Sequence, residues 1–199
     1  KGDMRVKAFD LAPWIDSYCE SYVENEVEQQ ALASVGIRSK VVPSFLGDVN
    51  LPISYQQSSK PKVYTSVSGD NFKLYGWHLL PELSDKYPEI EFHCYGNSEN
   101  FGSMRDNLIF HGRVPKEVMN KEIATMQGAL RLTEFDGFSE ILAKSVLMAQ
   151  WPVSVIKYPL ILSLEEFGIL KDKDKPNLEG RDYYIETLNK YPWNIKNLI

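Results

Sequence analysis

The stretch from Ala129 to Tyr158 constrains the fold of this chain more than any other. It begins with the mostly apolar run ALRLT, which lacks helical spacing and predicts a short buried strand. The glycine-containing run EFDGFS follows and predicts a loop. Leu142, Val146 and Ala149 then recur at helical spacing, and the run after Pro152 is rich in β-branched residues. Strand, loop, helix and strand in this order predict a parallel βαβ unit.

The loop of this unit occupies the position at which α/β proteins bind ligands. It leaves the carboxyl end of a strand and enters a helix N-terminus, where free backbone N–H groups and the helix dipole favour an anion. Gly137 would allow close backbone approach, and Ser139 can cap the helix or donate to a ligand oxygen. Glu134 and Asp136 can accept hydrogen bonds from sugar hydroxyls. The same pattern also fits Asp136 and Ser139 as a simple turn residue and a simple cap residue.

The segment LRLTEFDGFSEILAKSVLMAQWPVSVI resembles the signature of the retaining glycosyltransferases of family 4, the group 1 glycosyl transferases with the GT-B fold. In that family an acidic residue and a glycine-rich loop contact the donor sugar and diphosphate, and a second Glu on the next helix holds the ribose. This sequence keeps the acidic-Gly-aromatic-Ser loop and the Pro152-Val153 step. It departs at the second Glu, because Lys144 and Ser145 stand there, and Gly137 lies slightly further from Pro152 than is usual.

The N-terminal part of the chain predicts a helix from Ser17 to Val35 and a strand over residues 40–42. Its predicted buried stripe consists of Tyr18, Tyr22, Val23, Val27, Ala31 and Leu32. This pair resembles the crossover between the two GT-B domains, although any helix–strand pair would fit as well. Residues 45–62, with Pro, Gly, Gln and Ser, predict a linker. We therefore expect residues 1–45 to be the tail of an N-terminal domain with the crossover, and residues 46–199 to be a nucleotide-sugar-binding GT-B domain.

The remaining pattern alternates strands with helices. Strands are predicted over residues 62–67, 89–96, 108–115 and 160–162, and helices over residues 75–86, 116–126 and 178–189. Such alternation through at least four units predicts an α/β fold: a three-layer, Rossmann-like domain with a mostly parallel sheet.

The resemblance implies further site residues. Gly69 matches the glycine of the family's first phosphate loop, and Lys73 lies close to where that loop carries a lysine, although the usual arginine is absent. Arg113 could reach a phosphate, and the backbone from Gly137 through Phe138 to Ser139 would hold the diphosphate. Lys73 and Arg113 also have ordinary interpretations as solvated surface residues.

Composition limits the other classes of function. The net charge of −5 argues against a protein that holds nucleic acid by its phosphates. Two cysteines without a CxxC motif indicate a reducing cytoplasm, and three scattered histidines predict no structural metal. No apolar run reaches the roughly 20 residues that span a bilayer. The N-terminus lacks a signal-peptide pattern, and Met4 in fourth place suggests added residues or a fragment.

These observations together imply the donor-binding half of a retaining glycosyltransferase. It would move a sugar from a nucleoside-diphosphate sugar to a glycan or lipid acceptor, with Glu134 and Asp136 on the donor sugar and with no cofactor. We expect a cytoplasmic protein, with any membrane association provided by an N-terminal part outside this chain. We expect the isolated chain to bind donor weakly and to turn over nothing.

Two other classes remain open. The first is a degenerate, non-catalytic glycosyltransferase-like domain used for binding or assembly, for which Lys144 and Ser145 are the motive. The second is a flavodoxin-like or nucleotide-binding regulator, which the glycine-poor segment from Ser66 onward disfavours.

Overall fold

The computed structural model describes residues 4–45, 47–69, 71–96 and 105–190, with the backbone alone for residues 4–8. The chain divides into two compact units, one of residues 1–46 with 190–199 and one of residues 47–189. This division falls inside the predicted linker, where residues 42–61 form no regular element among those described. The assignment of the first unit to the tail of an N-terminal domain stays a prediction.

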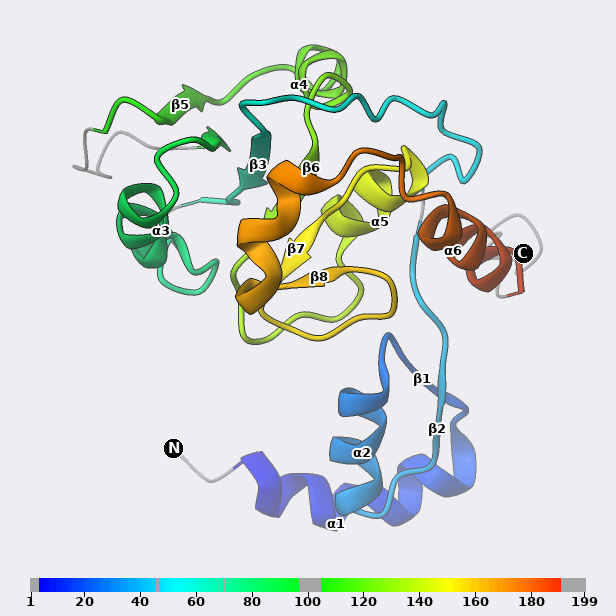
Figure 1. Ribbon diagram of the computed structural model, residues 1–199. Helices are drawn as coiled ribbons and strands as arrows, with labels where there is room; N and C mark the ends of the chain where they lie inside the picture. The colour runs from blue at the N-terminus through cyan, green and yellow to red at the C-terminus, as the bar shows by residue number, and fades with distance from the viewer. Residues whose placement is uncertain (1–3, 46, 70, 97–104, 191–199) are drawn as a thin grey trace. The chain divides into compact units, whose positions relative to one another are not determined.

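The first unit contains two helices and a pair of short strands (Figure 1). Its elements are α1 (Met4–Tyr18), β1 (Ser21–Val23), α2 (Glu26–Ser34) and β2 (Ser39–Val41), and the two strands pair in parallel. The Asn25 side chain caps α2 by accepting from the Glu28 N–H at 2.8 Å. Gly36, at φ 85°, ends α2 in the left-handed conformation that glycine adopts without strain.

The predicted helix from Ser17 to Val35 is therefore wrong. Residues 21–23 pair with residues 39–41, which divides the predicted helix into the end of α1, a strand and α2. The predicted buried stripe fails for the same reason, and the side chains of Tyr18 and Val27 are 78% and 71% exposed.

The second unit is a parallel sheet with helices on both faces. Its strands are β3 (Lys62–Ser66), β4 (Glu91–Tyr95), β5 (Leu108–Gly112), β6 (Gly128–Arg131), β7 (Val153–Ser154) and β8 (Leu162–Ser163). They lie in the order β5-β4-β3-β6-β7-β8, and every neighbouring pair is parallel. The predicted α/β, Rossmann-like fold is confirmed.

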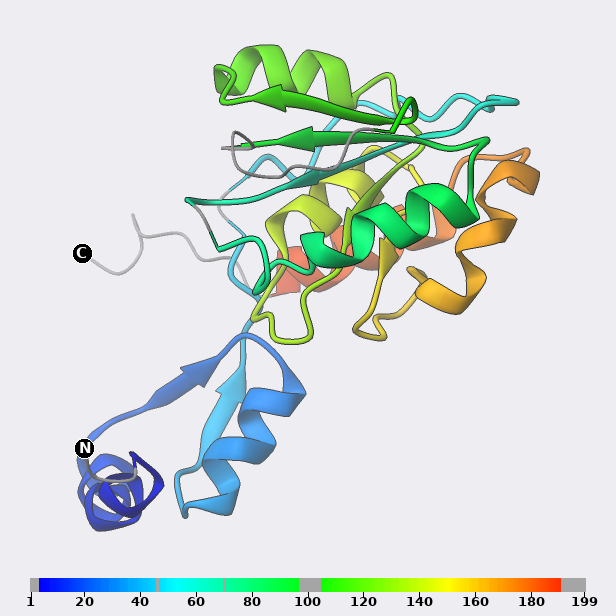
Figure 2. The same ribbon diagram turned by 90° about the vertical axis from the view of Figure 1, so that its left-hand side faces the viewer.

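Helical segments connect these strands. They are η1 (Trp77–Leu79), α3 (Leu80–Lys86), α4 (Lys116–Ile123), α5 (Glu140–Leu147), η2 (Leu164–Asp172) and α6 (Leu178–Lys190). Figure 2 shows α3 and α4 on opposite sides of strands β4 and β5. The predicted helix over residues 75–86 is confirmed in its second half, while its start is a tight 3-10 turn.

Alternate side chains of the central strands build two cores. Val63 of β3 and Leu130 of β6 pack into the core that also contains Trp77, Leu80 and Phe167. The neighbouring residues Tyr64 and Ala129 point to the opposite core, under α4 and α5, which contains Ile123, Met126 and Leu142. Because both faces of β3 and β6 are covered, these strands form the buried centre of a three-layer domain.

The βαβ unit predicted over residues 129–158 is present. Leu130 of β6 lies opposite Val153 of β7, and α5 connects the two strands. Gly128 opens β6 beside the carbonyl of Trp151, where a Cβ would lie 2.1 Å from that oxygen. Only a glycine permits this approach of the two backbones.

Candidate functional site

The strand order reverses between β3 and β6. The chain continues from β3 to β4 and β5 on one side, and from β6 to β7 and β8 on the other side. Loops that leave the carboxyl ends of β3 and β6 therefore diverge and open a crevice, where open α/β sheets bind their ligands. A cavity of about 250 Å³ lies at this place. It is lined by Ser66, Val67, Ser68, Tyr75, Arg131, Asp136, Phe138, Ser139, Glu140 and Ile141.

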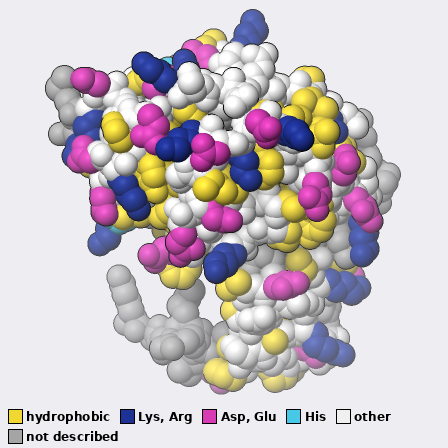
Figure 3. Space-filling view, in the orientation of Figure 1, with side chains coloured by type: hydrophobic (Ala, Val, Ile, Leu, Met, Phe, Trp, Pro, Cys, Tyr) yellow, Lys and Arg dark blue, Asp and Glu magenta, His cyan; other side chains and the backbone are white. Residues whose placement is uncertain are grey.

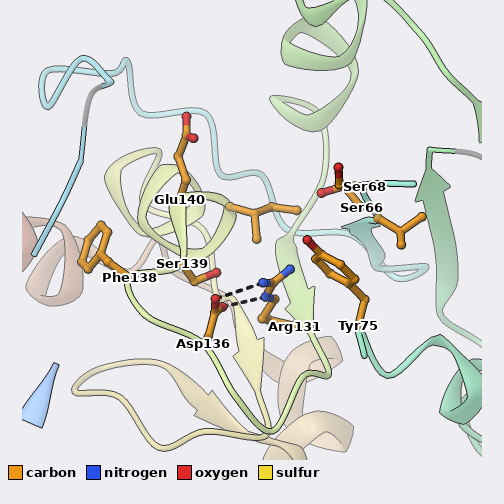
Figure 4. A pocket seen from close by; sticks show the side chains of 10 residues that line it. Ser66, Ser68, Tyr75, Arg131, Asp136, Phe138, Ser139 and Glu140 are labelled. Atoms are coloured by element: carbon orange, nitrogen blue, oxygen red, sulfur yellow. Dashed lines mark hydrogen bonds and ion pairs between the residues drawn. The ribbon is translucent and has the colours of Figure 1, made fainter. Parts of the chain in front are cut away.

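One wall of the cavity follows β3. Ser66 ends the strand, Ser68 follows, and Gly69 turns the chain with φ 66°. The segment then closes a turn in which the Tyr75 N–H donates to the Asn71 carbonyl at 3.1 Å. This turn brings the Tyr75 ring into the cavity (Figure 4).

The other wall follows β6 and carries an ion pair. Arg131, the last residue of β6, donates from Nε to Asp136 Oδ2 at 2.7 Å and from Nη2 to Asp136 Oδ1 at 3.0 Å. The guanidinium also lies over the ring of Tyr75, with its central carbon 4.8 Å from the ring centroid. The Arg131 and Asp136 side chains are 15% and 14% exposed, so the pair is largely withdrawn from water.

The N-terminus of α5 forms the end of this wall. Ser139 is the N-cap residue, and its carbonyl accepts from the Ala143 N–H at 3.0 Å. The residue is only 7% exposed, yet its hydroxyl has no hydrogen-bond partner among the described residues. A buried hydroxyl without a partner is costly, so a ligand oxygen in the cavity would satisfy it.

Glu140 adds a negative charge near this helix end. Its carboxylate forms an ion pair with Lys144 at 2.8 Å, one turn further along α5. In Figure 4 the Glu140 carboxylate points away from the Arg131–Asp136 pair. The pairing and the direction both reduce its repulsion of an anion in the cavity.

The structure brings three of the sequence-predicted site residues together. Asp136, Phe138 and Ser139 line the cavity, with Gly137 between them in the chain. Glu134 is exposed on the same loop but does not line the cavity.

The other predicted site residues lie outside the cavity lining. Gly69 and the exposed Lys73 follow its first wall in the chain, and the exposed Arg113 follows β5. Their contacts with a donor stay predictions.

Seven of the ten lining residues were not predicted as site residues, and Arg131 and Tyr75 are the two that the geometry makes important. Arg131 had a signal, because it is a charged residue within the apolar run ALRLT of a strand predicted to be buried. Tyr75 had none, since it was assigned to the start of a helix.

Across the described residues, no group of three or more His, Cys, Asp or Glu side chains is placed to hold a metal ion. Among the same residues, no helix combines the length and the apolar character needed to cross a bilayer. Figure 3 shows acidic and basic side chains interspersed over the visible face of the 47–189 unit, so neither sign dominates that face.

No family model and no curated protein matches the sequence of this chain. Solved structures do match. HepE from Anabaena, in complex with UDP and glucose, has a TM-score of 0.66 at 12% identity, over 94% of this chain and 63% of HepE. Sucrose-phosphate synthase from Thermosynechococcus elongatus has a TM-score of 0.72 at 10% identity, over 100% of this chain and 61% of that protein.

A third match is TarM from S. aureus, in complex with UDP, Fondaparinux and alpha-GlcNAc-glycerol. Its TM-score is 0.65 at 14% identity, over 92% of this chain and 42% of TarM. The fold is thus that of a GT-B glycosyltransferase-like domain, as the sequence predicted. The chain spans 63% of the length of HepE and 61% of that of the synthase.

Proposed function

We propose that this chain contains the donor-binding half of a retaining glycosyltransferase and holds a nucleoside-diphosphate sugar in the cavity between β3 and β6. The observation that carries the proposal is the buried Ser139 hydroxyl at the N-terminus of α5, which lines this cavity and has no hydrogen-bond partner in the part of the chain that the structure describes. A diphosphate oxygen would satisfy this hydroxyl and the first backbone N–H groups of α5 together. UDP is the first nucleotide to test, because the HepE and TarM structures contain it.

The sugar would then extend from the diphosphate towards an acceptor, a glycan or a lipid. Glu134 and Asp136 remain the predicted carboxylates near the sugar. The α5 N-terminus and protein cations would offset the charge of the leaving diphosphate without a metal ion. Because the acceptor half of such a site belongs to another domain, we expect donor binding without turnover by this chain alone.

The test is calorimetric titration of the chain with UDP, GDP and their common sugar conjugates. Replacing Ser139 with alanine should lower the affinity for the nucleotide that binds by about fivefold to tenfold, which is the effect of losing one hydrogen bond. Ser163, the N-cap of η2 outside the cavity, offers a matched control, and Ser163→Ala should leave the affinity unchanged. Equal nucleotide affinity in the wild type and in Ser139→Ala would contradict the proposal.

A second candidate function is supported by Lys144. A lysine stands where the family resemblance places the ribose carboxylate, and it forms an ion pair with Glu140 rather than facing a ligand alone. A degenerate domain that binds or assembles without donor would show no nucleotide binding in the chain or in any longer natural form. Nucleotide binding that appears only in a longer form would instead indicate a site completed by the additional domain.

A further inference from the structure

Arg131 is a largely buried cation at the end of a central strand, with its side chain 15% exposed. A buried guanidinium needs a carboxylate or a ligand to offset its loss of hydration. Asp136 provides one such partner, and the face of the Tyr75 ring provides another contact. These contacts fix the plane of the guanidinium within the cavity.

The ion pair uses only part of the hydrogen-bonding capacity of Arg131. The guanidinium carries five N–H donors, and Asp136 accepts one from Nε and one from Nη2. Nη1 has no hydrogen-bond partner among the described residues. In Figure 4 the guanidinium lies between Asp136 and Tyr75, with Ser66 and Ser68 across the cavity, so its remaining donors are available to a ligand.

The ligand chemistry follows from these donors. A planar guanidinium matches the oxygens of a phosphate. Because the Arg131 guanidinium is already held in place by its neighbours, it would bind these oxygens with little further loss of side-chain entropy. The unpartnered Ser139 hydroxyl lines the same cavity, so two independent donors converge on one volume. Both would be satisfied by the oxygens of a diphosphate.

The family resemblance implies an arginine in the loop after β3, and this sequence has none there. In the loop after β3, residues 67–76 contain Lys73 as their only basic residue, and that side chain is exposed and outside the cavity lining. Arg131 places a cation in the cavity from the opposite wall.

We propose that Arg131 is the cation that binds the donor diphosphate, and that Asp136 is a positioning residue that holds Arg131 instead of a ligand of the donor sugar. This inference rests on the proposed function. The sequence predicted that Asp136 contacts the donor sugar, whereas this inference gives it the task of holding Arg131. The two roles predict different effects of an Asp136 substitution on the binding of UDP and of UDP-glucose.

The test compares UDP, UDP-glucose, uridine and inorganic pyrophosphate as calorimetric ligands. Arg131→Met should lower the affinity for UDP and for pyrophosphate by about tenfold or more, which is the effect of losing a charged hydrogen bond. It should leave the affinity for uridine unchanged. Arg131→Lys should recover part of the loss, because it restores the charge without the planar fork. Arg105→Met is the matched control, since Arg105 forms a similar pair with Asp85 outside the cavity, and it should change nothing.

Asp136→Asn separates the two roles of the carboxylate. If Asp136 acts through Arg131, the variant weakens UDP and UDP-glucose by the same factor, and adding it to Arg131→Met causes little further loss. Weakening of UDP-glucose alone would overturn the positioning role. Should Arg131→Met fail to fold, Arg131→Lys and Asp136→Asn provide the same comparisons.

The outcomes also separate this inference from the proposed function. Wild-type binding of pyrophosphate that depends on Arg131, without binding of any nucleotide, would support the anion site and contradict the function. Nucleotide binding that is unchanged in Arg131→Met and Arg131→Lys would support the function and overturn the inference. If the wild type binds none of the four ligands, both are wrong.

Discussion

Gly76 lies so close to Leu132 that a Cβ on the glycine would be 2.2 Å from the Leu132 carbonyl oxygen and 2.4 Å from its Cβ. Gly76 belongs to the segment after β3, and Leu132 is the first residue after β6. The two walls of the cavity are therefore in close backbone contact at this point. The fold determines the width of the site at this contact.

We expect Gly76→Ala to be among the most destabilising single substitutions in the chain. The added methyl group meets backbone atoms that cannot rotate away, and the residue has a positive φ of 71°, so the cost should exceed about 3 kcal/mol. The free energy of unfolding from urea titration measures it. Gly112→Ala is the control, because Gly112 has a similar φ of 68° with open space around it and should cost only about 1 kcal/mol. An equal loss of unfolding free energy in the two variants would contradict the importance of the close contact between Gly76 and Leu132.

We also expect substitutions of Asn177 to reduce the stability of the fold strongly. Its side chain accepts from the Gly180 N–H at 3.0 Å, which caps α6, and donates to the Leu160 carbonyl at 3.0 Å. Asn177→Ala removes both bonds at a site that is 2% exposed and should cost about 2 kcal/mol. Asn177→Ser keeps a capping oxygen and loses the donor to Leu160, so its thermal midpoint should lie between those of alanine and the wild type. A serine variant as unstable as the alanine variant would contradict the two-bond account.

The stability of the fold should depend on the protonation of His93. Burial lowers the pKa of His93 below its ordinary value, and the neighbouring His111, at 2.8 Å between Nδ1 and Nε2, adds to this shift. The unfolded chain therefore binds a proton more readily below about pH 6.5, so the contribution of neutral His93 is present above that pH and is lost as the pH falls. Lys62 opposes the charged form as well, whereas Glu91, 3.5 Å from Nε2, favours it.

We expect the free energy of unfolding to fall between pH 7 and pH 5, and His93→Gln to flatten this fall. The exposed His78 provides the control, and His78→Gln should retain the wild-type slope. Chemical denaturation at several pH values measures all three proteins. Parallel curves for the wild type and His93→Gln would show that another group is responsible.

Much of the second unit was predictable because its signals are local. The apolar run before EFDGFS, the helical spacing of Leu142 and Val146, and the β-branched residues after Pro152 lie within one segment and specify one βαβ unit. The position of the site loop at the carboxyl end of a parallel strand follows directly from that unit.

The remaining features depend on contacts between distant segments. Apolar spacing in residues 17–35 suggested one helix. Residues 21–23 instead pair with residues 39–41 and therefore form a strand. The partners of Arg131 were equally hidden, because Tyr75 reaches it from the loop after another strand. The carboxylate of Asp136 was predicted to face a sugar, and only the folded geometry shows that it holds a guanidinium.

The most direct test of the central claim is a two-dimensional ¹H–¹⁵N NMR titration of the chain with UDP and GDP, after assignment of the backbone. We predict that one nucleotide shifts the amide signals of residues 66–69 and 136–141, on the two walls of the cavity, and leaves those of α6 unchanged. A nucleotide that shifts signals elsewhere and not on these walls, or no shift at millimolar nucleotide, would contradict a donor site between β3 and β6.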